Sequence, residues 1–230
     1  MEISKRQEFI LNTLIKEHIK TAQPISSGFL VEKYKLDISS ATARNEMSEL
    51  EELGYIYQPH TSAGRIPTAK AYNYYVQTSV LNKKPITNSF KILDQVFSDS
   101  EDGFKKTAKA IAEISKNAVF WAFHKNDLYY TGISNLFLQP EFRQSNVVCD
   151  VSIIIDRMEE IIADIFDDLN FGEDIFIGEK NPFGNFLSSV LLKYNYKNHS
   201  AVVGILGPLR MDYDKNLSLI RFLKNKIESK

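Results

Sequence analysis

Apolar residues recur at helical spacing near the start of the chain and predict two helices. The first is expected to run from a cap at Ser4 to about residue 20, with Gln7 placed to complete a capping box. Its apolar residues are Ile10, Leu11, Leu14, Ile15 and Ile19. The second helix is short and is expected to begin at a cap provided by Ser26 or Ser27. Its apolar positions are Leu30, Val31 and Tyr34.

A third helix is predicted over residues 41–53, because apolar side chains again follow the 3.6-residue period. Ser39 and Ser40 are suited to cap it, since a short hydroxyl accepts hydrogen bonds from the free N–H groups of a first turn. Gly54 supplies the left-handed residue that often ends a helix. The apolar stripe consists of Ala43, Met47, Leu50 and Leu53.

The pattern after this helix changes from helical to extended. Residues 55–57 are β-prone, Pro59 ends the strand, and residues 61–65 form a turn of small polar residues tipped by an arginine, before a second short strand at Ile66. Three helices followed by two strands and a loop predict a winged helix-turn-helix. Such a unit places the start of its third helix in the major groove of DNA, and its loop against the backbone or the minor groove.

Ten residues of this unit are the expected DNA contacts. Capping explains a serine at the start of the third helix, but it does not explain Arg44 and Asn45, which can pair with guanine and adenine. In the loop, Gly64 permits close backbone approach, and Arg65 is suited to probe the minor groove or a phosphate. Which residues read bases rather than phosphates stays open at this stage. The expected contacts are Ser39, Ser40, Thr42, Arg44, Asn45, His60, Thr61, Ser62, Gly64 and Arg65.

A fourth helix is expected from Pro67 and Thr68 to Leu81, and the polar residues 82–85 then mark a domain boundary. Residues 1–81 are assigned to the winged helix-turn-helix and residues 82–230 to a second domain. This domain mixes helices with strands in antiparallel order, which predicts an α+β sandwich. Its expected elements are helices over 89–97 and 104–114, strands over 118–123 and 128–131 around a turn at 125–127, a short strand over 136–138, a long helix over 145–169, a strand over 174–178, paired strands over 186–194 and 200–206, and a helix from Asp212 to Ile227.

Composition narrows the functional classes. A chain of 230 residues with 43% hydrophobic residues can bury a core in one large or two small domains. No apolar run approaches the roughly 18 residues of a membrane span, and residues 1–9 contain no apolar signal core. The single cysteine, Cys149, excludes an internal disulfide and suits a reducing compartment, so a cytoplasmic location is expected.

The charge of the chain argues against a strong general attraction to nucleic acid. The formal net charge is −1, and residues 1–80 contain nine Lys/Arg and nine Asp/Glu. DNA affinity would then depend on where the cations lie and on two copies acting together. Lys5 and Arg6 are candidates either for flanking phosphate contacts or for exposed solubilising charge. The rival interpretation is a protein-interaction or ligand-sensing module whose winged helix does not read DNA sequence.

Motifs for catalysis and cofactor binding are missing from the sequence. It has no Walker A, G-x-G-x-x-G or G-x-S-x-G pattern, and its four histidines are too scattered for metal-ligand spacing. The loop over residues 168–172 follows a calcium loop only in part, because its glycine falls a position early. We therefore expect no enzyme activity, no cofactor and no metal site.

Several blocks of the sequence together resemble one known family. The most specific is SSATARNEMSELEELGYIYQPHTSAGRIPT over residues 39–68. The others are SKRQ (4–7), QPISS (23–27), YNYYV (72–76), GISNLF (132–137), QPEF (139–142), IGEKN (177–181) and GILGPLRMDY (204–213). These blocks resemble the HrcA family, the heat-inducible transcription repressors of bacterial chaperone operons.

The resemblance implies a dimeric repressor with an N-terminal winged helix and a GAF-like C-terminal domain. It implies binding to an inverted-repeat operator in double-stranded DNA, and regulation by the chaperonin GroEL, which heat diverts to unfolded clients. Family members are typically longer and carry a dimerisation domain inserted in the GAF-like part. Between Pro140 and Asp174 this chain is short, so the insertion is absent or reduced to the helix over 145–169. Ala71 stands where family members commonly have glycine.

Overall fold

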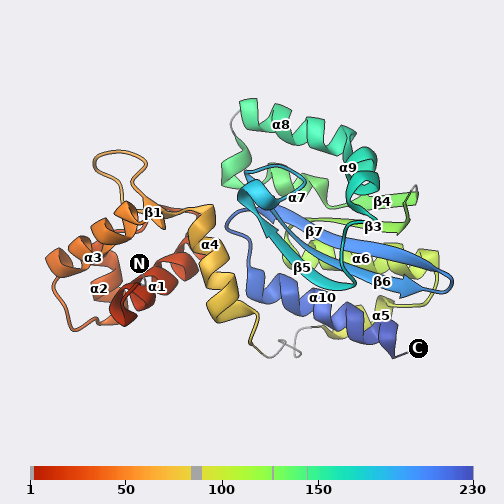
Figure 1. Cartoon of the computed structure of the whole chain (residues 1–230), viewed down its shortest axis with the longest axis horizontal. Coiled ribbons are helices and arrows are strands. Elements are labelled where there is room, and N and C mark those ends of the chain that lie inside the picture. Colours follow the sequence, from red (N-terminus) through yellow and green to blue (C-terminus); the bar gives the residue numbers. More distant parts are fainter. Residues whose placement is uncertain (1–2, 84–89, 126, 144, 230) are drawn as a thin grey trace. The chain divides into compact units, whose positions relative to one another are not determined.

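The computed structural model describes residues 3–83, 90–125, 127–143 and 145–229 of the chain (Figure 1). The chain divides into two compact units, Met1–Asn82 and Lys83–Lys230. The sequence places a boundary after residue 81. Parts of three expected features, at residues 84–85, Ser89 and Asn126, lie outside the described residues.

The first unit contains the helices and the two short strands in the predicted order. Each of α1 to α4 begins at a hydroxyl cap whose oxygen accepts a hydrogen bond from the N–H three residues ahead, and these caps are Ser4, Ser26, Ser39 and Thr68. Gln7 completes the predicted capping box. The elements are α1 (Lys5–Thr21), α2 (Ser27–Tyr34), α3 (Ser40–Glu52), β1 (Ile56–Tyr57), β2 (Ile66–Pro67), α4 (Ala69–Tyr75) and a π-helical turn (Val76–Val80).

A buried carboxylate joins the first two helices. Glu17 on α1 is fully buried, and it accepts hydrogen bonds from the ammonium groups of Lys33 (2.6 Å) and Lys20 (3.3 Å) and from the Tyr34 hydroxyl. Burial alone would raise the pKa of Glu17, but the three donors outweigh burial and lower this pKa to about 2. The ionised carboxylate is therefore part of what holds α1 against α2.

The second unit is built on a five-stranded antiparallel sheet in the order β4-β3-β7-β6-β5. The central pair, β6 and β7, is in register from Leu187↔Pro208 to Tyr196↔His199. The elements are α5 (Lys91–Val96), α6 (Glu101–Ser115), β3 (Ala118–His124), β4 (Asp127–Thr131), α7 (Ile133–Phe137), a 3-10 turn (Pro140–Arg143), α8 (Ser145–Asp156), α9 (Met158–Ile165), β5 (Gly172–Ile177), a second 3-10 turn (Gly178–Lys180), β6 (Leu187–Tyr196), β7 (His199–Pro208) and α10 (Tyr213–Glu228).

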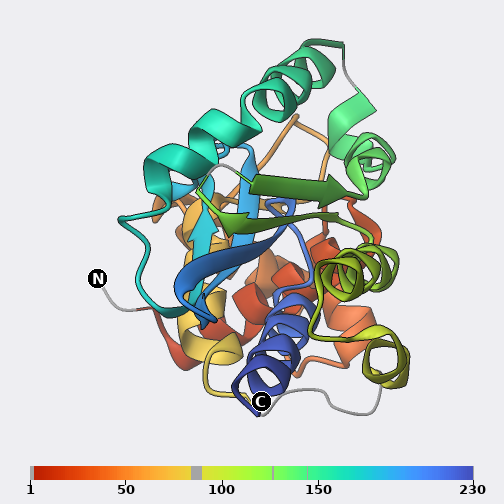
Figure 2. The ribbon, with the colours of Figure 1, turned by 90° about the vertical axis from the view of Figure 1, so that its right-hand side faces the viewer.

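Helices cover both faces of this sheet, as the α+β prediction requires (Figure 2). Helices α7, α8 and α9 lie over one face, where Phe120 packs in a core with Val151 and Ile162. Helices α6 and α10 lie over the other face, where Phe104 of α6 stacks on the buried Trp121 with 4.8 Å between ring centroids. Among the described helices, none combines the length and hydropathy that crossing a bilayer requires.

Two predicted elements of the second unit are wrong. Residues 136–138 are not a strand, because the chain turns at Gly132 (φ +72°) and enters helix α7. A run of three apolar residues cannot by itself distinguish the two states. Residues 145–169 are not one helix, because the backbone leaves helical geometry at Arg157, between α8 and α9. The sequence around Arg157 contains neither glycine nor proline, so no local signal marks this break.

An internal ammonium occupies the loop that partly resembled a calcium site. Lys193 of β6 is buried, and its Nζ donates to the carbonyl oxygens of Phe166 (2.7 Å) and Leu169 (2.9 Å) just beyond α9. The carbonyls that could face a cation therefore bind a lysine of the same chain. Two of the four histidines treated as scattered, His124 and His199, are brought together at adjacent hairpin ends, with 6.4 Å between ring centroids.

Candidate nucleic-acid interface

The start of α3 presents an exposed polar stripe. Ser40, Arg44 and Asn45 are exposed, whereas Ala43 and Met47 are buried against the rest of the unit. The helix is capped by the hydroxyl of Ser39, which is also 2.9 Å from the hydroxyl of the half-buried Thr42. The cap uses Ser39 and Thr42 locally and leaves the exposed side chains available to a partner.

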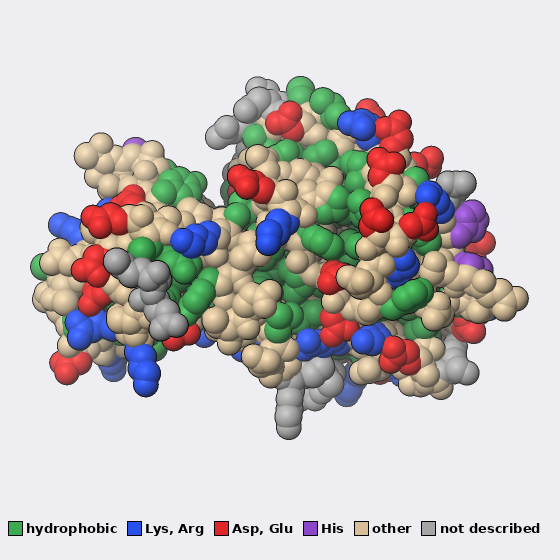
Figure 3. Space-filling view, in the orientation of Figure 1, with side chains coloured by type: hydrophobic (Ala, Val, Ile, Leu, Met, Phe, Trp, Pro, Cys, Tyr) green, Lys and Arg blue, Asp and Glu red, His purple; other side chains and the backbone are tan. Residues whose placement is uncertain are grey.

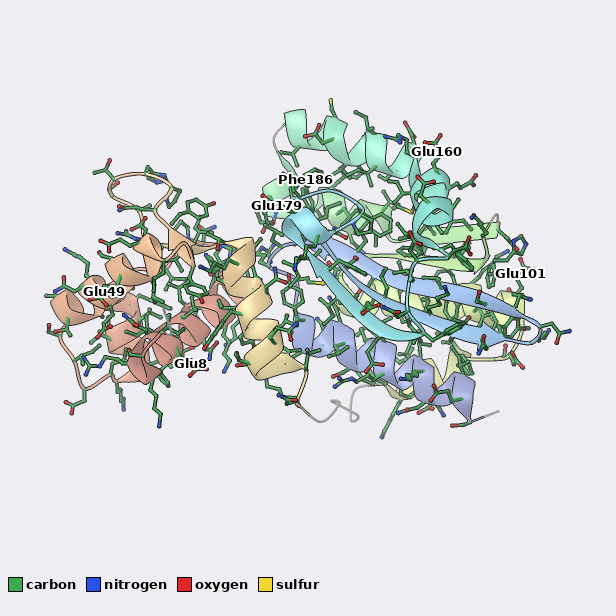
Figure 4. All side chains as sticks on the ribbon, viewed as in Figure 1. Glu8, Glu49, Glu101, Glu160, Glu179 and Phe186 are labelled. Carbon is green, nitrogen blue, oxygen red and sulfur yellow. The ribbon has the colours of Figure 1, made fainter. Side chains whose placement is uncertain are left out.

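The first acidic residues of α3 contact α1 instead of extending this stripe. Glu46 accepts a hydrogen bond from the Arg6 guanidinium at 3.1 Å, and Glu49 accepts one from the Gln7 side chain at 2.6 Å (Figure 4 labels Glu49 on α3). The first turn of α3 contains no acidic residue. Negative charge is therefore kept away from the end of the helix that would face DNA.

One carboxylate of α3 holds both ends of the wing loop, residues 58–65. Glu51 accepts a hydrogen bond from the backbone N–H of Gln58 and another from Nε of Arg65, each at 2.8 Å. The Gln58 side chain then donates to the carbonyl oxygens of Thr61 and Ala63, each at 2.9 Å. These bonds fix the shape of the loop before any partner arrives.

The wing tip is polar and carries no lysine or arginine. His60, Thr61 and Ser62 are exposed there, whereas the Arg65 side chain is only 15% exposed and pairs with Glu51. The sequence placed Arg65 at the tip of the loop. It lies at the base instead, because it continues into β2 and pairs with the chain just before α2.

Gly64 is required by a contact inside the protein. The backbone N–H of Ile25 donates to the carbonyl of Arg65 (2.9 Å), and the N–H of Arg65 donates to the carbonyl of Ile25 (2.8 Å). A Cβ added to Gly64 would lie 2.4 Å from the carbonyl carbon of Ile25. The close approach expected at Gly64 is thus made to Ile25, and it joins the base of the wing to the start of α2.

The space between α2, α3 and the wing is a cavity of about 440 Å³. Its lining residues come from the start of α2, from α3 and from the wing, and none of them is acidic. Sequence reasoning treated Ser26 and Ser27 only as caps and did not single out Gln58. The available signal was the serine–serine–glycine start of a helix whose first turn has no acidic residue. The lining residues are Ser26, Ser27, Arg44, Met47, Gln58, Thr61, Ser62, Ala63, Gly64 and Arg65.

Charged side chains of both signs are interspersed on the visible face of the first unit (Figure 3). Arg44 is an exposed cation on α3, and Arg6 and Arg65 are each paired with a glutamate. Among the described residues that line the cavity, Arg44 and Arg65 are the only lysines or arginines, so the lining is not broadly basic. The polar groups that the interface offers to a partner are hydroxyls, one side-chain amide, the N–H groups at helix starts and a small number of arginines.

Residues 73–217 match the family model described as "HrcA protein C terminal domain". The heat-inducible transcription repressor HrcA of Caldanaerobacter subterraneus subsp. tengcongensis is 43% identical over 117 residues, which cover 50% of this chain and 34% of that protein. The repressor of the same name from Pelotomaculum thermopropionicum is 32% identical over 166 residues, covering 70% of this chain and 48% of that protein. In both cases less than two thirds of the relative's length is matched.

A third relative and one solved structure match end to end. The HrcA repressor of Carboxydothermus hydrogenoformans is 24% identical over 328 aligned positions, covering 96% of each protein. Because this chain has only 230 residues, that relative contains segments that the chain lacks. The crystal structure of a hypothetical protein at 2.2 Å resolution has the same fold, with a TM-score of 0.79, 17% identity, and coverage of 99% of this chain and 98% of that one.

Proposed function

The chain belongs to the HrcA family of heat-inducible transcription repressors, and from that membership we propose that it represses heat-shock (chaperone) genes by binding an operator in double-stranded DNA. The observation that carries the proposal is the acid-free first turn of α3 beside a wing whose shape is already fixed by Glu51. Repression follows from steric block, since a protein seated on the operator excludes the transcription machinery.

The proposed binding species is a homodimer on an inverted repeat. A unit with equal numbers of Lys/Arg and Asp/Glu gains little from counterion release, so one copy would bind weakly. Two copies related by a two-fold axis place two α3 helices on half-sites one or more helical turns apart. Family resemblance supports the inverted repeat and supports the chaperonin GroEL as a regulator in the cytoplasm. The second unit is proposed as the regulatory and dimerisation part.

Binding to the inverted repeat of a chaperone operon is expected to be roughly a thousandfold or more tighter than binding to a scrambled duplex at physiological salt. Fluorescence anisotropy on labelled duplexes measures the ratio, and light scattering on the complex measures how many copies bind. A duplex with a single half-site is the matched control and should bind weakly. Equal affinity for operator and scrambled DNA would rule out sequence reading.

Replacing Asn45 by alanine is expected to weaken operator binding by about 1–3 kcal/mol while leaving scrambled DNA unaffected. Asn45 is exposed on the stripe of α3, and an asparagine amide pairs with the edge of adenine. The same anisotropy assay checks this prediction, with circular dichroism as the folding control. Equal losses on both duplexes would contradict base reading by this side chain.

A protein-interaction role remains the second candidate, and the absence of lysine and arginine from the wing tip is the observation that favours it. The two roles differ in their response to salt, since binding to DNA releases counterions and weakens steeply as salt rises. A partner affinity that stays flat between about 50 and 200 mM salt would favour a protein surface.

A further inference from the structure

The first turn of α2 has hydrogen-bond donors that its own cap does not use. The Ser26 hydroxyl accepts from the N–H of Phe29 at 3.2 Å and satisfies one of the donors at this helix end. Across the described residues, the backbone N–H groups of Ser27 and Gly28 have no acceptor. The first turn contains no acidic residue that would neutralise the positive end of the helix dipole.

A serine that is buried as a residue, and whose hydroxyl has no partner among the described residues, lies beside these donors. Ser27 is only 6% exposed, and its side chain makes no hydrogen bond within the described part of the chain. The hydroxyl oxygen itself is not one of the buried unpaired atoms, so it keeps contact with solvent. Ser27 lines the cavity between α2, α3 and the wing, so its hydroxyl is placed to meet a group that enters from solvent.

Arg44 faces the same cavity from α3. Its guanidinium is the cation there that remains available, since Arg65 pairs with Glu51. Gly28 has open space where a side chain would stand, with nothing within 4 Å of an added Cβ. Asn45, one residue further along α3, does not line the cavity. Ser27 and Arg44 thus face one cavity, and Gly28 follows Ser27 on the first turn of α2 without lining it.

We propose that this cavity binds one phosphate group, held by the N–H groups of Ser27 and Gly28, the Ser27 hydroxyl and the Arg44 guanidinium. The phosphate is a phosphodiester of the duplex backbone, which rests on the proposed function. Arg44 then positions the protein on DNA without reading sequence, and base reading on α3 falls to residues such as Asn45. An anion is the matching ligand because the convergent groups are all donors and none is acidic.

The decisive variants are Gly28→Asp and Gly28→Asn, which have nearly the same size and differ in charge. Aspartate in the first turn of a helix is favourable for the helix dipole, and either residue replaces a poor helix former. Gly28→Asp should therefore fold at least as stably as Gly28→Asn. Its carboxylate would repel the phosphate, so its DNA affinity should fall about tenfold below that of Gly28→Asn at low salt.

The affinities are measured by anisotropy on the operator and on a scrambled duplex across a salt series. Gly28→Asp and Arg44→Ala should each weaken binding to both duplexes by the same factor. Each should reduce the slope of log affinity against log salt by about 0.9 per bound copy, one phosphate contact each, and so by about 1.8 for the dimer. If Gly28→Asp binds as tightly as Gly28→Asn, or if Arg44→Ala loses affinity only for the operator, the proposal is wrong.

Two further outcomes distinguish failure of the phosphate site from failure of the proposed function. If the unaltered protein binds neither duplex, the proposed function fails, and the backbone assignment fails with it. Titrating inorganic phosphate into the DNA-free protein and following the amide signals of Ser27 and Gly28 by NMR tests the cavity alone. If inorganic phosphate binds in the cavity but Gly28→Asp leaves the salt dependence of DNA binding unchanged, the cavity binds a free anion. The proposed contact with the DNA backbone would then be wrong.

Discussion

Replacing Glu17 by glutamine is expected to lower the free energy of unfolding of the N-terminal unit by about 3 kcal/mol at neutral pH. Glu17 is fully buried, and its carboxylate accepts from Lys33, Lys20 and Tyr34. A neutral amide keeps the shape of the side chain but loses the charge that makes these hydrogen bonds strong. The loss should be large because the side chain has no access to water that could replace the donors.

The contribution of Glu17 depends on pH in a defined direction. Its pKa is lowered from 4.5 to about 2 in the folded chain, so the folded state holds the proton less tightly than the unfolded state. The stabilisation is fully present above pH 4.5, declines as pH falls, and is gone below about pH 2. The unfolding free energy of Glu17→Gln should therefore vary less with pH across this window.

Chemical denaturation of the full chain at several pH values measures this difference. Helical circular dichroism follows both units, whereas the fluorescence of the single tryptophan, Trp121, follows only the second unit and is an internal control. Glu32→Gln, which removes an exposed carboxylate from α2, is the matched control and should change little. If the unfolding free energy of Glu17→Gln runs parallel to that of the unaltered chain across pH, Glu17 is not the group that makes stability depend on pH in this window.

Much of the N-terminal unit could be predicted because its signals are local. Each cap lies within three residues of the N–H that it accepts from, and Gly54 takes the left-handed conformation (φ +74°) just after α3. The pairing of β6 with β7 was also predictable, since Lys197 and Asn198 separate two apolar runs with a short turn. These features depend on neighbours in sequence, and a single chain displays them directly.

The features that were missed depend on residues far apart in sequence. Nothing local indicates that Glu51 would hold Arg65, or that Gly64 would meet the backbone of Ile25. Both contacts move Arg65 from the tip of the wing to its base. The ten predicted DNA contacts remain predictions, but the fold now divides them into residues that build the interface and residues left exposed to a partner.

Replacing Gly64 by alanine is expected to open the base of the wing and lower operator affinity at least about tenfold, since a preformed loop would have to be reordered on binding. The added Cβ would lie 2.4, 2.5 and 2.7 Å from the C, O and N atoms of Ile25. These are backbone atoms, which cannot rotate away as the end of a side chain can. The two hydrogen bonds between Ile25 and Arg65 should break, costing about 2 kcal/mol of stability.

The hydrogen exchange rate of the Arg65 amide in the DNA-free protein reports on this bridge, because that N–H donates to Ile25. It should rise in Gly64→Ala. Gly28→Ala is the matched control for stability, since open space surrounds Gly28 and alanine favours a helix, so it should stabilise the unit by about 0.5–1 kcal/mol. Slow exchange in Gly64→Ala would mean that the backbone adjusts around the methyl group. Fast exchange with undiminished operator affinity would instead show that the wing stands clear of the duplex, and α3 with the start of α2 would then carry the whole interface.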